Sequence, residues 1–555
     1  MIVSSIRLLK RKLKLALIAS MTILTVLGGE PVSAKTVITA GVLTGPKSVN
    51  PFVELTGVYY SIFRLVYDTL LVPTVGGKTV KNLATDIIPS SDGMVYTVKI
   101  RTNAVFLDGT PVTAEDVAFT HNYIIKNELG AFSQYSSPLK EVTVIDSTTV
   151  KMTLNEKFNR DWLDQNTFSW IPILPRHIWS KISKEEAVGD LALDKLIGSG
   201  PFTISEFEAD HFTRLAVTDD GKKHFAPAFD EIIIKQYAND SSMLQDFKVG
   251  NLNIIDSVPF NSLPMMEKME NVALSTTPAI NLSEVIFNSW PKAYEEGRKK
   301  HPHPALKDPK LRYALDWVLD ENMATKIVHG KYSIAGSHML PTGYNHYCNT
   351  SLSVRGYDID KAKKILADAG YRDTDNDGIL ETADGLPLEF DVWLPAPSAH
   401  ETDYAGVWAR AANKVGIKLN ISIMDFDTLW AKVSPNGNYD IAFWDWAGNV
   451  DPDFILSVLT SANAVQDGWS DSGYSNPSYD VLYDQQRLAN STEERRQLIW
   501  KMQEILYTDA PYLVYSYYGV TGALNTAKTT GDMQLSQSID GLLSKEFLLN
   551  LKPRN

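Results

Sequence analysis

Two tryptophans and three aspartates stand close together at 444–453 and form the first candidate site in the sequence. Trp444 and Trp446 flank Asp445, and Asp451 and Asp453 flank a proline. Carboxylates beside aromatic rings suit three roles: the acid/base pair of a hydrolase, a ligand-binding surface, or a turn that leads into a helix. The residue types alone leave all three roles open.

The sequence around these residues favours a strand, a turn and a helix. Residues 439–444 read as a short strand, Gly448 and Asn449 as a turn, and 454–459 as a helix with Asp451 or Asp453 as its N-cap. On an extended chain, residues two apart face the same side. We therefore expect both indoles on one face, as a stacking or pocket-lining surface, and Asp445 on the other.

An acidic stretch at 373–384 resembles an EF-hand calcium loop, with Gly378 at the turn position. The ligand positions one, three, five, seven, nine and twelve are occupied by Asp373, Asp375, Asp377, Ile379, Glu381 and Asp384. Asp384 is shorter than the usual bidentate glutamate, and a strand-like segment rather than a helix follows. A structural calcium ion and a metal-free acidic turn both remain open.

Three common catalytic motifs are absent from the sequence. It contains no G-x-S-x-G, no H-E-x-x-H and no P-loop, and Asp451 and Asp453 lie too close along the chain to work across a glycosidase cleft. His301 and His303 have no third ligand nearby and are interpreted as part of a solvated loop. Cys348 is the only cysteine and is expected to be structural. A secreted hydrolase is thus the weaker alternative.

The N-terminus has the features of a secretory signal peptide. A basic start precedes the apolar run 15–27, which is too short to span a membrane, and a signal-peptidase site ends at Ala34. We expect cleavage after Ala34, with no lipoprotein cysteine and export to the periplasm or the extracellular face. Cleavage removes five basic residues and one acidic residue, so the net charge changes from −13 to −17. Such an acidic chain is a poor nucleic-acid binder.

Strand and helix patterns alternate along the chain, which predicts an α/β protein of two or more domains. Residues 36–42 and 94–100 read as strands. Thr113 with Asp116, Asp308 with Pro309, and Ser491 with Glu494 have the spacing of helix N-termini, and Gly370 ends a further helix that begins at Asp360.

Seven motifs follow one another along the chain after the signal. They are YTVKIRTNAVFLDGTPVTAEDVAFT (96–120), IGSGPF (197–202), DPKLRYAL (308–315), DTDNDG (373–378), DPDFILSVLT (451–460), GYSNPSYDVLYD (473–484) and DAPYLVYS (509–516). The first contains the strand, the Asp108-Gly109 turn and the helix start at Thr113. In this order the motifs resemble the family 5 extracellular solute-binding proteins of ABC transporters, the peptide-binding group, and the resemblance extends over essentially the whole chain after the signal.

The resemblance implies a two-lobed periplasmic-binding-protein fold, type II, with hinge strands between the lobes. Lobe I would be discontinuous, with residues 35–284 and 515–555, and lobe II would comprise 285–514. The protein would act as a monomer that captures its ligand between closing lobes and delivers it to a membrane permease. Transport and ligand sensing by the same fold cannot be separated on the sequence.

The resemblance also assigns ligand residues. In peptide-binding relatives, an aspartate after the tryptophan that corresponds to Trp446 pairs with the ammonium of the peptide, and that position is most nearly Asn449 here. Either Asp445 or Asp451 takes over, or the ligand is an oligosaccharide whose hydroxyls bind amides and whose rings stack on indoles. Tyr59 and Tyr60 are candidate contacts from lobe I, with packing as their alternative role.

Overall fold

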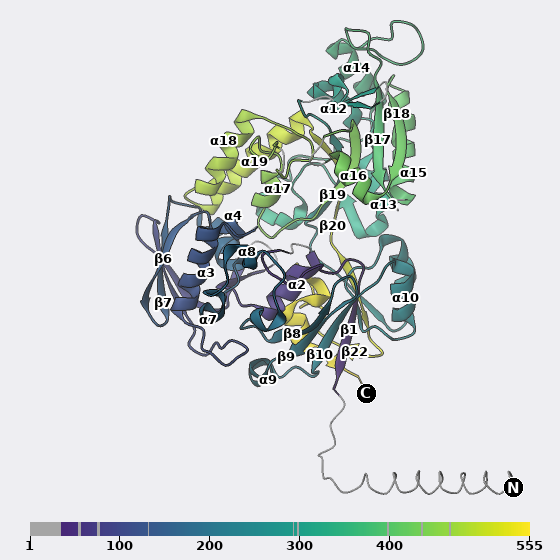
Figure 1. Cartoon of the computed structure of the whole chain (residues 1–555). Helices are drawn as coiled ribbons and strands as arrows, with labels where there is room; N and C mark the ends of the chain where they lie inside the picture. Colours follow the sequence, from purple (N-terminus) through teal and green to yellow (C-terminus); the bar gives the residue numbers. More distant parts are fainter. Residues whose placement is uncertain are drawn as a thin grey trace, which may run out of the picture.

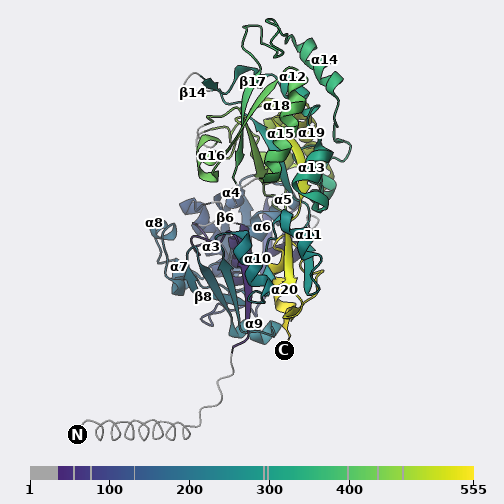
Figure 2. The same ribbon diagram turned by 90° about the vertical axis from the view of Figure 1, so that its right-hand side faces the viewer.

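The computed structural model describes residues 35–53, 57–74, 78–130, 132–291, 294–296, 299–396, 399–433, 437–465 and 468–554. It has two α/β lobes, one above the other in Figure 1. The lower lobe contains β1 and the C-terminus, and the upper lobe is formed by the middle of the chain (Figures 1 and 2). The predicted two-lobed α/β fold is confirmed. The predicted signal peptide lies outside the described residues.

A seven-stranded sheet forms the centre of the lower lobe. β1 lies in its middle, parallel to its neighbours β10 and β11, and the outer strands pair antiparallel. In spatial order the strands are β12 (Val272–Thr276), β21 (Thr521–Asn525), β11 (Ile254–Ile255), β1 (Val37–Val42), β10 (Glu231–Gln236), β9 (Phe212–Val217) and β8 (Phe202–Glu208). Two segments far apart in the sequence therefore share one sheet, as the discontinuous lobe requires.

A second sheet with its own hydrophobic core also belongs to the lower lobe. It consists of the antiparallel strands β4 (Ala84–Pro89), β5 (Val95–Ile100), β7 (Thr149–Leu154) and β6 (Leu139–Asp146). The predicted strand at 94–100 is β5. Helix α3 (Ala114–Asn127) packs on β6, and Thr113 and Asp116 form its predicted capping box. The short hairpin β2 (Leu71–Thr74) and β3 (Lys78–Lys81) lies beside this sheet.

The six-stranded sheet of the upper lobe positions the candidate site. Its order is β16 (Ser333–Ala335), β20 (Tyr512–Tyr518), β13 (Asn281–Phe287), β19 (Ile441–Trp446), β17 (Glu389–Pro395) and β18 (Lys418–Met424). β17 is parallel to β18 and to β19, so these three strands have their carboxyl ends at the same edge. β13 is antiparallel to both β19 and β20.

The helices follow their sequence signals closely. Asp308 and Ser491 cap α12 and α19, and Gly370 ends α14 in the left-handed conformation. The Glu494 carboxylate, however, accepts from the Asn490 N–H, so the predicted reciprocal box at Ser491 is half formed. The upper-lobe helices are α12 (Pro309–Asp316), α13 (Glu321–Val328), α14 (Ile359–Ala369), α15 (Ala399–Asn413), α16 (Phe426–Val433), α17 (Asp453–Ser457), α18 (Pro477–Leu488) and α19 (Thr492–Asp509).

The other described elements are shorter or belong to the lower lobe. The lower-lobe helices are α2 (Gly57–Val66), α4 (Phe132–Ser136), α5 (Arg160–Gln165), α6 (Thr167–Trp170), α7 (Arg176–Trp179), α8 (Lys184–Ala187), α9 (Asp219–Phe225), α10 (Asp240–Lys248), α11 (Leu263–Met266) and α20 (Lys545–Asn550). Two small ladders pair β14 (Tyr294–Glu296) with β15 (Lys299–His301) and β22 (Thr529–Thr530) with β23 (Lys552–Pro553).

The chain crosses between the two large sheets at 277–280 and at 519–520. The crossing segments are hydrogen-bonded to each other: the Thr277 N–H donates to the Val520 carbonyl, and the Val520 N–H donates to the Thr277 hydroxyl, both at 2.9 Å. Gly519 lies against the Thr277 carbonyl, where a Cβ would clash. The predicted boundaries after 284 and 514 fall inside β13 and β20, because the chain passes between the sheets a few residues before the first and a few residues after the second.

The lobes also touch on one side, away from the crossings. The Asn159 N–H donates to the Arg487 carbonyl at 2.7 Å, and its side-chain amide donates to the Ala489 carbonyl at 3.0 Å. Val450 of the upper lobe belongs to the main core cluster of the lower lobe. Among the described helices, none combines the length and the apolar character that crossing a membrane requires.

Candidate ligand-binding site

Strand β19 ends at the junction of the lobes and carries the first candidate residues. Trp444 and Trp446 both pack with one hydrophobic cluster of the upper lobe, whereas Asp445 accepts a hydrogen bond from the hydroxyl of Ser283 on the neighbouring strand. The predicted alternation of the two indoles and the carboxylate is confirmed. It follows from the pleat of the strand, in which successive side chains point to opposite faces.

Trp446 is half-buried and held from behind. Its indole N–H donates to the Asp471 carboxylate at 3.0 Å, and its ring meets Phe454 edge-to-face at 5.9 Å. Phe454 in turn meets Trp469 edge-to-face at 5.7 Å, and Trp469 is 45% exposed. The three rings form an aromatic row from Trp446 to the surface. Phe454 and Trp469 were missed in the sequence analysis, since neither alternates with polar residues on a strand.

Trp444 is a packing residue. It is 6% exposed and stacks on Phe426 and Trp430 of α16, with ring centroids 5.8 and 5.6 Å apart. Phe426 and Trp430 are themselves 52% and 42% exposed, so α16 rather than Trp444 presents this aromatic surface. Trp444 therefore offers little surface to a ligand, and of the two predicted indoles Trp446 is the better placed.

Asp445 is open to solvent but closely surrounded by protein. Besides the Ser283 hydroxyl, the Tyr518 hydroxyl donates to its carboxylate at 3.4 Å. Loss of hydration is the largest cause that raises the pKa of Asp445 to about 6, and the two hydrogen bonds oppose it. The ring of Tyr518 meets Phe260 of the lower lobe at 5.5 Å, which places Asp445 at the lobe junction.

Asn449 lies in the turn after β19 and reaches toward the other lobe. Its side-chain amide is 3.5 Å from the Tyr135 hydroxyl of the lower lobe, and its backbone N–H donates to the Tyr344 hydroxyl at 3.1 Å. Gly448 lies against the Ile280 carbonyl, where a Cβ would clash, so the turn requires glycine at that position. The predicted turn is present, and it sets the Asn449 amide between the lobes.

Asp451 is engaged in a buried ion pair. Arg495 of α19 donates to both of its oxygens at 2.7 and 2.8 Å, and the two side chains are 0% and 1% exposed. Asp451 also accepts from the Asp453 N–H at 2.8 Å, while Pro452 takes the N-cap position of α17. This geometry corrects the prediction of Asp451 as a ligand contact and supports its structural alternative at the helix start.

Asp453 is engaged in the scaffold as well. Its carboxylate accepts from the Gln486 amide at 2.7 Å and from the Tyr483 hydroxyl at 3.2 Å, both on α18. The two aspartates around the proline thus tie α17 to α18 and α19. They do not form an acid/base pair across an open site, which removes the main sequence argument for a hydrolase.

Tyr59 and Tyr60 lie next to each other on α2 but differ in their surroundings. Tyr59 is 1% exposed, belongs to the core, and donates to the Val49 carbonyl at 3.2 Å. Tyr60 is half-buried and meets Trp170 edge-to-face at 4.8 Å, and Trp170 stacks on Tyr135 at 5.8 Å. Tyr59 is therefore a packing residue. Tyr60 belongs to an aromatic group that faces Asn449 through Tyr135.

The acidic loop gathers four of its six predicted calcium ligands. Carboxylate oxygens of Asp373, Asp375, Asp377 and Glu381 all lie within 4.8 Å of one another, and Glu381 is buried. Asp384 is outside this group because the chain turns back at 382–386, where the Thr382 N–H donates to the Leu386 carbonyl. Oxygen donors at this spacing fit calcium, so the site stays a prediction with Asp384 removed from it.

His301 differs from its predicted environment. It is 2% exposed, with its ring nitrogens 3.0 Å from the Asp440 carboxylate and 3.8 Å from that of Asp391. The prediction of a solvated loop is therefore wrong for His301, because the loop folds back onto the start of β17 and β19. The lone Cys348 is buried, as expected for a structural residue.

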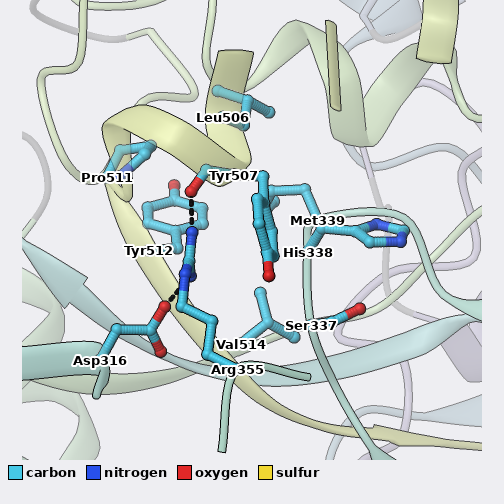
Figure 3. Close-up of a pocket in the computed structure, with 10 residues that line it drawn as sticks. All are labelled: Asp316, Ser337, His338, Met339, Arg355, Leu506, Tyr507, Pro511, Tyr512 and Val514. Atoms are coloured by element: carbon cyan, nitrogen blue, oxygen red, sulfur yellow. Dashed lines mark hydrogen bonds and ion pairs between the residues drawn. The ribbon is translucent and has the colours of Figure 1, made fainter. Parts of the chain in front are cut away.

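A small cavity of about 10 Å³ behind the sheet serves structure rather than binding (Figure 3). Within it, Arg355 pairs with Asp316 of α12 and donates to the Tyr507 carbonyl of α19. A space of that size holds about one water molecule. It joins the ends of two helices and leaves no room for a ligand.

Two lobes connected by two adjacent crossing segments, with aromatic rings and an open carboxylate at their junction, define the class of two-lobed ligand-binding proteins. The family model of bacterial extracellular solute-binding proteins, family 5 (Middle), matches residues 78–467. The chain belongs to this family.

Relatives of known name and structure have the same architecture. The oligopeptide-binding protein AppA of Bacillus subtilis is 26% identical over 79% of this chain and 78% of its own. Its structure in complex with a nonapeptide superposes with a TM-score of 0.76 at 22% identity, covering 94% of this chain and 99% of that one. A mannohexaose-bound protein of Thermotoga maritima superposes with a TM-score of 0.75 at 20% identity over 94% and 99%.

Proposed function

We propose that the chain is the extracytoplasmic binding component of an ABC importer, and that it captures a peptide between its two lobes for delivery to a membrane permease. The observation that carries the proposal is the open carboxylate of Asp445 at the lobe junction, one residue before the half-buried indole of Trp446. A peptide has an ammonium group that can pair with the Asp445 carboxylate and apolar side chains that can pack on the Trp446 indole.

Two further observations support peptide as the ligand class. The similar AppA of Bacillus subtilis is named for oligopeptide binding, and its structure holds a nonapeptide. The described carboxylates of Asp451 and Asp453 are held by Arg495, Gln486 and Tyr483, so catalysis by this pair is not part of the proposal. Binding as a monomer, with release to the permease, requires no chemical step.

An oligosaccharide is the second candidate ligand. The Asn449 amide and the aromatic row from Trp446 to Trp469 favour it, because sugar hydroxyls bind amides and sugar rings stack on indoles. The mannohexaose complex of a protein with the same fold is consistent with this alternative. The two ligand classes differ in what they require of Asp445. A peptide ammonium pairs with a charged carboxylate, whereas an oligosaccharide does not require Asp445 to be charged.

A thermal-shift screen tests the proposal. Residues 35–555 are refolded to remove carried ligand and heated with pentapeptides, with mannohexaose, and alone. A ligand at a hundred times its dissociation constant adds about 2.7 kcal/mol to the free energy of unfolding. We expect a rise in melting temperature with peptides. A rise with mannohexaose alone would replace peptide by oligosaccharide.

A further inference from the structure

Asn159 of the lower lobe binds the C-terminal end of helix α18 in the upper lobe. Its backbone N–H donates to the Arg487 carbonyl at 2.7 Å, and its side-chain amide donates to the Ala489 carbonyl at 3.0 Å. The last carbonyls of a helix have no partner within the helix, so α18 obtains two donors from the other lobe. The Asn159 side-chain oxygen meanwhile caps α5, where it accepts from the N–H groups of Asp161 and Trp162. One asparagine therefore serves a helix end in each lobe.

The Arg487 side chain extends the same contact. Its guanidinium carbon lies 5.3 Å from the ring centres of both Phe158 and Trp162, which belong to the core of the four-stranded sheet in the lower lobe. A cation is attracted to an aromatic face at this distance. Lys157 adds an exposed hydrogen bond to the side-chain oxygen of Asn490 at 2.7 Å. The end of α18 is thus held by the small sheet of the lower lobe through three kinds of contact.

A buried polar chain links this contact to the candidate site. Arg495, which pairs with Asp451 after β19, also donates to the Tyr347 hydroxyl at 3.3 Å. That hydroxyl donates in turn to the Asp161 carboxylate of the lower lobe at 3.3 Å. Arg495 donates as well to the Gln486 side chain of α18 at 2.9 Å. The segment after β19 is therefore joined to α18 and, through one tyrosine, to the lower lobe.

The contact lies away from the chain crossings between the lobes. In Figure 1, α18 and α19 lie above α3 and α4 on the left, whereas β20, which leads into the crossing at 519–520, lies nearer the centre. Hydrogen bonds need heavy-atom distances of about 3 Å, so a rotation about the crossings breaks bonds that lie at a distance from them. Water can satisfy the freed groups once the lobes part. Such a contact can form and break repeatedly, as lobes that open and close require.

We propose that residues 157–162 and 487–490 form a latch that stabilises the closed arrangement of the lobes whatever the ligand is. The inference rests on the proposed function, in which the lobes close on a peptide. Asn159 is then a positioning residue, since it acts on the ligand through the arrangement of the lobes. The apparent dissociation constant varies inversely with the fraction of protein that is competent to bind. The latch therefore changes the affinity for every ligand by the same factor.

Asn159→Asp tests the latch and keeps the cap of α5. Aspartate caps a helix as well as asparagine does, but it has no amide to donate to the Ala489 carbonyl. We expect Ala-Lys-Ala-Lys-Ala and Ala-Gln-Ala-Gln-Ala, titrated by calorimetry into the refolded chain, each to bind about tenfold more weakly. The ligand-free variant should also have a larger radius of gyration in X-ray scattering. Asn155→Asp is the matched control and should change neither quantity, because Asn155 donates to the Ser137 and Leu139 carbonyls of its own lobe.

Arg487→Met is the second variant. It keeps an apolar stem, removes the charge from above Phe158 and Trp162, and should weaken binding of both peptides about threefold. Losses in Asn159→Asp that differ between the two peptides would show that Asn159 acts on the ligand directly. Unchanged affinities together with an unchanged radius of gyration would show that the contact is static. Either result overturns the inference and leaves peptide binding intact.

Failure of the proposed function is visible separately. If neither peptide binds the wild type, the peptide proposal fails, and the radius of gyration alone then decides on the latch. A larger radius in Asn159→Asp than in Asn155→Asp supports the latch, and equal radii overturn it.

Discussion

Asp445 and Asp451 lie six residues apart and have opposite surroundings. Asp451 is buried in a bidentate pair with Arg495, whereas Asp445 is open to solvent and has two hydroxyl partners and no cationic partner among the described residues. The Asp451 carboxylate stabilises the upper lobe, and the Asp445 carboxylate stays accessible. Residue type and sequence distance cannot separate these roles, because the distinction depends on an arginine 44 positions away in the chain.

Arg495→Met gives the largest expected effect. It leaves Asp451 buried and unpaired, which should lower the free energy of unfolding by about 3 to 5 kcal/mol in a urea titration. The matched control is Arg496→Met, in which the more exposed neighbour of Arg495 loses its pair with Glu493. That change should leave the free energy of unfolding nearly unchanged, because solvent screens this exposed pair. If the two substitutions lowered the free energy of unfolding equally, the buried pair would contribute no more to stability than the exposed one.

Substitutions at the two tryptophans of β19 should also differ in how much they lower the stability of the fold. Trp444→Ala removes a ring stacked on Phe426 and Trp430 and should cost about 3 to 5 kcal/mol of stability. Trp446→Phe keeps an aromatic ring and removes the N–H donor to Asp471, so its cost should be about 1 kcal/mol.

Ligand binding should show the reverse order for these two variants. Trp446→Phe is expected to weaken binding of Ala-Lys-Ala-Lys-Ala severalfold in calorimetry, and folded Trp444→Ala is expected to bind like the wild type. A loss of affinity confined to Trp444→Ala would mean that the ligand lies against α16 instead of Trp446.

Calcium provides a smaller, separable change. At a hundred times its dissociation constant it should raise the free energy of unfolding by about 2.7 kcal/mol, and Asp373→Asn should abolish that gain. Asp384→Asn is the control, because Asp384 lies outside the gathered carboxylates. Thermal unfolding with calcium and with a chelator checks both. Identical melting temperatures under the two conditions would remove the metal from the loop.

The smallest expected effect is the stability of Asp445→Asn and its pH dependence. The pKa of Asp445 in the folded chain, about 6, exceeds the usual value for aspartate, so the folded state binds more protons than the unfolded state between about pH 4 and 6. Stability from this group therefore falls as the pH rises through that window. In Asp445→Asn, the free energy of unfolding should decrease less between about pH 4 and 6 than in the wild type. At pH 7 the variant should be at least as stable as the wild type. A steeper decrease of stability with pH in the variant than in the wild type would mean that the folded protein stabilises Asp445 as an anion.

The fold could be predicted largely because its signals are local or recur in order. The caps at Asp308 and Thr113, the strands at 36–42 and 94–100, and the alternation at 444–446 depend on a few neighbouring residues. The lobe boundaries were displaced by a few residues, because the short crossings at 277–280 and 519–520 contain no charged or polar run that would mark them in the sequence. The separate core of the four-stranded sheet has no local signal.

The site was less predictable, because its chemistry depends on partners distant in sequence. Asp471 lies behind Trp446 from 25 positions away, and Ser283 reaches Asp445 from 162 positions away. His301 seemed solvated because its carboxylate neighbours, Asp391 and Asp440, come from two later strands. Tyr59 and Tyr60 were equivalent in the sequence, and only the packing of α2 distinguishes them.

The two crossing segments have a mechanical consequence. Because Thr277 and Val520 are hydrogen-bonded and Gly519 has no space for a side chain, the two chain crossings between the lobes form one narrow seam. Such a seam resists sliding and leaves rotation as the soft degree of freedom. Such a rotation is described by a single angle between the lobes, and a residue larger than glycine at 519 would press on the Thr277 carbonyl and change that angle.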